Sequence, residues 1–133
     1  MRKIEHIGIA VSNLDEAQEI YSNLLGQNPY KSETVDLEGV VTTFFKVGKS
    51  KIELLQGTND KSVISKFIKK RGEGIHHIAF EVDNIKDEMK RLKDKGFKII
   101  NKTPQKGADN KLICFVHPKS TNHVLIELCQ EIK

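Results

Sequence analysis

Two histidines and two glutamates occupy matching places in two similar pairs of short stretches. IEHIGIAV contains His6 and GIHHIAFEV contains His77, while KIELLQ contains Glu53 and LIELCQ contains Glu127. Imidazole nitrogen and carboxylate oxygen suit a borderline divalent ion such as Co, Mn, Fe, Ni or Zn. Four such ligands without a thiolate leave room for water or substrate oxygens, which suits catalysis better than a structural role. The four residues therefore indicate a catalytic metal site.

The matching stretches belong to an internal repeat, since a constant offset also relates Asn13 to Asn84. Each half has the pattern of a strand, a helix and then three strands. This pattern predicts an α+β fold and a single domain of two βαβββ modules. Module one covers about 1–57, a linking helix about 60–71, and module two about 74–133.

Hydrophobic periodicity predicts the individual elements. Alternating apolar residues predict strands near 3–11, 29–37, 40–47, 51–55, 75–82, 97–100, 111–117 and 123–129. Apolar residues at helical spacing predict helices within 13–26, 59–72 and 84–96, each of which reaches a glycine at its end.

Strand alternation predicts which side chains share a face. His6 lies opposite the apolar face that contains Ile7, and His77 lies opposite the face that contains Ile78. Both glutamates alternate with apolar neighbours in the same way. We expect the apolar faces to pack on helices and the polar faces to line a hollow, where buried carboxylates require compensation and a metal ion is the simplest way to supply it. His76 falls on the apolar face, so we exclude it as a ligand.

Composition limits the class of partner. The net charge of +4 comes from scattered lysines, and the chain has no tryptophan, so the stacking platforms of a nucleic-acid-binding protein are missing. The charge fits a small anionic ligand, or serves only solubility. No apolar run is long enough to span a membrane. Residues 1–11 lack the features of a signal peptide, and Cys114 and Cys129 lie in strand-like runs, so we expect a cytoplasmic protein without disulfides.

The blocks HIGIAVSNLDEA, RGEGIHHIAFEV, HPKST and LIELCQ resemble the vicinal oxygen chelate (glyoxalase/bleomycin resistance/dioxygenase) superfamily and, within it, the methylmalonyl-CoA epimerase family. The resemblance spans essentially the whole chain. It implies paired βαβββ modules that form a cupped mixed sheet around a metal site, and a homodimer. It also implies that His6, Glu53, His77 and Glu127 hold cobalt or manganese, with zinc, nickel or iron as alternatives.

The resemblance implies interconversion of (2R)- and (2S)-methylmalonyl-CoA. A proton leaves the carbon between the thioester and the carboxylate and returns on the other face, through an enolate that a metal ion stabilises. Inversion requires acid–base groups on both faces, and Glu127 is one candidate. The second falls in VDLEGV, where spacing from Glu53 favours Asp36, and Glu38 directly precedes the Gly-Val pair. Each of these two acids is also typical of a solvated turn.

Two other functions are compatible with parts of the sequence. Another metal-dependent enzyme of the superfamily, such as lactoylglutathione lyase (glyoxalase I), would share the four ligands. A non-enzymatic small-molecule-binding protein of the superfamily commonly lacks them. The blocks RGEGIHHIAF and HPKST favour the epimerase, although Asn122 and His123 replace glycines that relatives often carry there.

Overall fold

The computed structural model describes residues 1–133 and divides them into two units. The first unit consists of Met1–His6 and His77–Lys133, and the second consists of Ile7–His76. Strand β1 (Lys3–Ala10) belongs to both units, because the boundary falls after His6. The module boundaries expected from the sequence stay a prediction.

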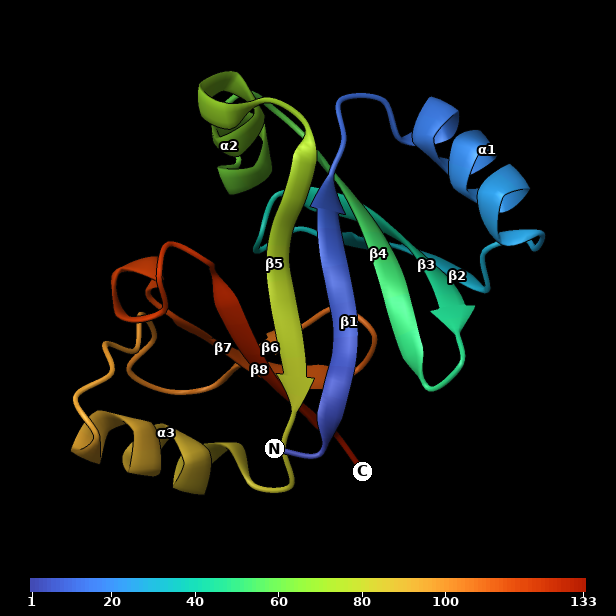
Figure 1. Ribbon diagram of the computed structural model, residues 1–133. Helices are drawn as coiled ribbons and strands as arrows, with labels where there is room; N and C mark the ends of the chain where they lie inside the picture. Colours follow the sequence, from blue (N-terminus) through green and yellow to red (C-terminus); the bar gives the residue numbers. More distant parts are fainter. The chain divides into compact units, whose positions relative to one another are not determined.

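The first unit contains a mixed sheet and the α-helix α3, which can be followed in Figure 1. Its elements are β5 (Gly74–Glu81, from His77 onward), α3 (Ile85–Asp94), β6 (Gln105–Gly107), β7 (Lys111–Val116), the 3₁₀ helix η1 (Pro118–Ser120) and β8 (Ile126–Glu131). The strand order is β1-β5-β8-β7-β6, in which β5 and β8 run parallel while β8, β7 and β6 pair antiparallel.

The second unit repeats the order of strand, helix and three strands. After the end of β1 it contains α1 (Leu14–Leu25), β2 (Lys31–Val35), β3 (Val40–Val47), β4 (Ser50–Gly57) and α2 (Val63–Arg71). The strand order is β2-β3-β4-β1, and β2, β3 and β4 pair antiparallel. The α+β class and the βαβββ order predicted for each half are confirmed.

Equivalent polar residues fix the start of the first helix in each repeat. Asn13 caps α1 by accepting the Glu16 N–H, and Asn84 caps α3 in the same way. Gln56 accepts the Leu14 N–H at 2.6 Å, and Gln130 accepts the Ile85 N–H at 2.8 Å. Since the first N–H groups of a helix have no partner inside the helix, these four side chains satisfy donors that would otherwise be unpaired. Part of the repeat is therefore structural.

The predicted packing of the apolar strand faces on helices is confirmed. In the first unit Leu128 and Val82 share a buried cluster with Met89 and Leu92 of α3. In the second unit Leu54 and its neighbours pack on α1. The opposite faces of these strands are thereby left to the polar side chains.

Some sequence-based boundaries are wrong. The strand expected near 97–100 is a single bridge between Ile99 and Val116, and the three-residue strand β6 was not expected. The strand expected at 123–129 begins only at Ile126. His123 has a φ of 70°, outside the range of a strand, and the Val124 N–H donates to the Thr121 carbonyl within the preceding turn. No helix is long and apolar enough to cross a membrane.

Candidate metal centre

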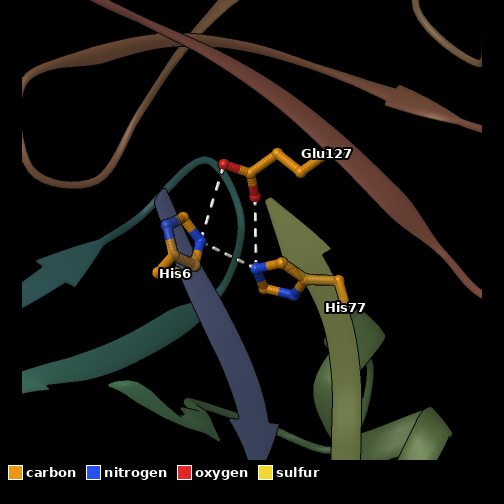
Figure 2. A group of neighbouring side chains, drawn as sticks. All are labelled: His6, His77 and Glu127. Carbon is orange, nitrogen blue, oxygen red and sulfur yellow. Dashed lines mark hydrogen bonds and ion pairs between the residues drawn. The ribbon is translucent and has the colours of Figure 1, made fainter. Parts of the chain in front are cut away.

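Side chains from three strands of the first unit converge at one point (Figure 2). They are His6 of β1, His77 of β5 and Glu127 of β8. The two Nε2 atoms lie 3.0 Å apart, and the carboxylate oxygens of Glu127 lie 3.7 Å from His6 Nε2 and 3.2 Å from His77 Nε2. Only 3–5 % of each residue is exposed, so the cluster is shielded from bulk water.

The register between β5 and β8 places Glu127 beside the histidines. Glu127 pairs with Ala79, which follows His77 by two residues and therefore lies on the same face. Leu128 lies on the other face and packs against α3. The alternation that buries Leu128 in the core thus directs Glu127 to the cluster.

Apolar side chains lie beside His77 and Glu127. Ala79, Ile113 and Cys129 form a buried cluster with Phe115, whose ring meets the His77 ring edge-on at 6.1 Å between centroids. A carboxylate in such surroundings is unfavourable unless a positive charge or several hydrogen-bond donors compensate it. A bound cation would supply that compensation.

The distances fit the donor set of one divalent ion. Two ligand atoms about 2.1 Å from an ion, at an angle of about 90–110°, lie roughly 3.0–3.4 Å from each other. The separations of 3.0, 3.2 and 3.7 Å fall in or near this range, and the three residues' ligand atoms all lie within 4.8 Å of one another. Two nitrogens and a carboxylate are also the ligand types that borderline ions prefer. The residues present therefore fit a metal.

A neighbouring carboxylate orients His6. Nδ1 of His6 lies 3.0 Å from Oε1 of Glu5, which is 2 % exposed. When Nδ1 carries the ring proton and donates it to Glu5, the lone pair of Nε2 faces His77 and Glu127, as in a carboxylate–histidine–metal arrangement. Sequence alternation assigns Glu5 to the face opposite His6, so sequence reasoning missed it. The one available signal was an acid directly adjacent to a candidate ligand.

The two cysteines are not part of this donor set. Both are buried free thiols. Burial, and to a lesser degree the charge of Glu127, raises the pKa of the Cys114 thiol to about 12. Burial, followed by the charge of Glu127 and then that of Glu5, raises the pKa of the Cys129 thiol.

Glu53 and His76 both belong to the second unit. Glu53 lies on β4 opposite Phe44 and is 4 % exposed, so it is a buried carboxylate in its own unit. The ring of His76 contacts Phe67 of α2 edge-on, with 4.9 Å between ring centroids. Of the four predicted ligands, the structure brings together His6, His77 and Glu127, and His76 is not in that group.

Asp36 and Glu38, the predicted alternatives for the second acid–base group, lie in the turn between β2 and β3. The Glu38 N–H donates to the Val35 carbonyl, and the Gly39 N–H donates to the Asp36 carbonyl. The Asp36 side chain is exposed and that of Glu38 is half-buried. Both are turn residues within the second unit, and their role as acid–base groups stays a prediction.

Comparison with known proteins gives consistent relatives over the whole chain. The chain is 42 % identical to the mitochondrial methylmalonyl-CoA epimerase of Dictyostelium discoideum, over 95 % of this chain and 76 % of that protein. It is 36 % identical to the ethylmalonyl-CoA/methylmalonyl-CoA epimerase of Cereibacter sphaeroides, over 96 % of this chain and 97 % of that protein. A solved structure of a Streptomyces coelicolor methylmalonyl-CoA epimerase variant, in complex with 2-nitronate-propionyl-CoA, superposes with a TM-score of 0.96 at 32 % identity, covering 100 % of this chain and 99 % of that chain.

A family model matches residues 5–115, a range that includes His6, Glu53 and His77. Glu127 lies beyond this range, and the superposed epimerase structure covers the whole of this chain, including Glu127. The chain belongs to the Glyoxalase/Bleomycin resistance protein/Dioxygenase superfamily.

Proposed function

We propose that the protein is a methylmalonyl-CoA epimerase, an isomerase that interconverts the (2R) and (2S) forms of its substrate. The observation that carries this proposal is the buried cluster of His6, His77 and Glu127, in a chain whose epimerase relatives match it over nearly its full length. The nitronate in the related complex is a planar delocalised anion, as is an enolate, which agrees with the proposed chemistry.

The proposed metal ligands are His6, Glu53, His77 and Glu127. The first, third and fourth are supported by their convergence, and Glu53 by its position in the sequence repeat and its burial in the second unit. A divalent ion held there, which we propose to be cobalt or manganese, would stabilise negative charge on oxygen atoms of the substrate. Zinc, nickel and iron are the alternatives.

Proton transfer is the task of the protein's own carboxylates. The proton to be removed lies between a thioester and a carboxylate, both of which help to delocalise the negative charge left on the carbon. One carboxylate accepts the proton on one face, and a second returns a proton on the opposite face. We propose Glu127 for one face, and the sequence suggests Asp36 or Glu38 for the other.

The direct test is incubation of each enantiomer with the purified protein in deuterated water. An epimerase converts either enantiomer into a mixture of the (2R) and (2S) forms and incorporates deuterium at C2. A lactoylglutathione lyase or a binding protein would do neither, so the same assay separates these alternatives from the proposal.

We also propose a homodimer in the cytoplasm. The dimer rests on the resemblance to the epimerase family and predicts a mass of about twice the 15.1 kDa of one chain by light scattering. The cytoplasm agrees with two buried cysteines that are both free thiols.

A further inference from the structure

One face of the strands β2, β3 and β4 in the second unit bears Glu33, Thr42 and Glu53 in neighbouring positions, with Lys31 on the same face of β2. Glu33 pairs with Thr42 across β2 and β3, and Glu53 pairs with Phe44 across β3 and β4. Because Thr42 and Phe44 are two residues apart, Glu33, Thr42 and Glu53 share one face. Thr43 lies on the other face, where its hydroxyl is 3.4 Å from Gln18 of α1.

Apolar packing separates this group from the turn between β2 and β3. At the turn end of the same face, Val40 and Leu55 are buried against Ile64 of α2, and Val35 packs on them. Asp36 and Glu38 come after this apolar layer, outside the paired strands. Glu33 is therefore the acid of this hairpin that shares a face with the proposed ligand Glu53.

The environment of Glu33 suits contact with a substrate. Its side chain is 30 % exposed, whereas Glu53 and Thr42 are almost fully buried. Lys31 lies on the same face of β2, with its Nζ 3.3 Å from Oε1 of Glu33.

Thr42 is the direct cross-strand neighbour of Glu33 and has an unusual hydroxyl. Thr42 Oγ1 is buried and has no hydrogen-bond partner. Directly opposed residues of an antiparallel pair have Cβ atoms about 4.5–5.5 Å apart, so rotation about χ1 can bring this hydroxyl to the Glu33 carboxylate. An unpartnered hydroxyl destabilises the folded protein, and a role in positioning Glu33 would account for its presence.

We infer that Glu33 is the second proton-transfer group of the epimerase, positioned by the hydroxyl of Thr42. The inference rests on the proposed function and assigns its second face to Glu33 in place of Asp36 or Glu38. A Glu33 oxygen takes the C2 proton, the electron pair of the C–H bond moves into the enolate, and C2 then takes a proton from the carboxyl group on the opposite face. Proton exchange between the two carboxyl groups and water restores both for the next turnover.

Glu33→Gln tests this assignment, with Glu19→Gln on the exposed side of α1 as the matched control. We expect Glu33→Gln to lose epimerisation by a factor of about 10²–10⁴ and to keep its bound metal. In deuterated water one enantiomer should still exchange its C2 proton with retention of configuration, through the remaining carboxylate, while the other enantiomer stays unlabelled. Glu19→Gln should match the parent.

Several results would overturn the assignment. One is epimerisation by Glu33→Gln at the parent rate. Another is the one-sided exchange pattern in Asp36→Asn or Glu38→Gln while Glu33→Gln stays active. Failure of the parent protein to exchange or epimerise either enantiomer would instead refute the proposed function itself, and the role of Glu33 with it.

Thr42→Val separates the positioning role from a structural one. Valine has nearly the same shape and removes a buried hydroxyl without a partner, so the variant should be at least as stable as the parent. Its kcat should nevertheless fall about fivefold, the factor that one hydrogen bond typically supplies, while KM changes little. Thr42→Ser keeps a hydroxyl and should therefore have the parent's kcat. An unchanged kcat in Thr42→Val would show that the hydroxyl does not position Glu33.

Discussion

Replacing His77 with alanine should remove most of the stabilisation that a divalent ion gives to this protein. The change removes one of the three ligand atoms that converge in the first unit and leaves His6 and Glu127 in place. Loss of a residue that only orients a ligand typically costs 10–100-fold in metal affinity. Loss of a ligand itself should therefore cost about 100-fold or more.

The size of the effect follows from linkage. At a metal concentration 100 times the dissociation constant, the parent gains about 2.7 kcal/mol of unfolding free energy. A variant with 100-fold weaker binding gains only about 0.4 kcal/mol at that concentration. For a domain of this length these gains correspond to roughly 10 °C and 1–2 °C in Tm.

Differential scanning calorimetry with and without cobalt or manganese gives both shifts. Comparing each variant with its own metal-free form cancels the cost of the cavity that alanine leaves. His76→Ala is the matched control, because His76 packs on Phe67 and lies outside the cluster, so it should keep the parent's shift. If His76→Ala loses the shift and His77→Ala keeps it, our assignment of the ligands is wrong.

Three further predictions concern residues around the candidate site and in the fold. Glu5→Ala should weaken metal binding about 10–100-fold by isothermal titration, because His6 loses the acceptor of its Nδ1 proton; unchanged affinity would contradict an orienting role. The buried Cys114 thiol should resist thiol reagents in the native state. Because its pKa is raised from 9.0 to about 12, its contribution to stability should be complete below about pH 9 and should decline as the pH rises toward 12. Urea unfolding at several pH values would detect this decline. Asn84→Ala should lower the unfolding free energy by about 1 kcal/mol through loss of the α3 cap, and Asn84→Asp should largely preserve it.

The repeated parts of the fold could be predicted because local sequence determines them. Asn13 and Asn84 cap helices from positions directly before the apolar stripe, and Leu54 and Leu128 alternate with the predicted ligands. Strand β6 could not be predicted, because Gln105–Gly107 has no apolar alternation and pairs only through the neighbouring β7.

At the site, too, the residues that could be predicted are those whose position follows from local sequence. His6, His77 and Glu127 were predictable because period-two alternation fixes the face of a strand residue. Glu5 could not be predicted as a partner of His6, because alternation assigns adjacent residues to opposite faces of a strand. The proposed role of Glu33 could not be predicted for a different reason. Its cross-strand pairing with Thr42 depends on the register between β2 and β3, and that register depends on the length of the turn.

The central claim is that this protein moves the C2 proton of methylmalonyl-CoA with the help of a bound divalent ion. The most direct measurement follows deuterium incorporation at C2 of (2R)- and (2S)-methylmalonyl-CoA in deuterated water, with metal-loaded and chelator-treated protein side by side. We predict that the loaded protein labels and interconverts both enantiomers, and that chelation abolishes this activity until cobalt or manganese is restored. Absence of both labelling and interconversion with metal-loaded protein would contradict the epimerase assignment, and full activity after complete chelation would contradict the role of the metal.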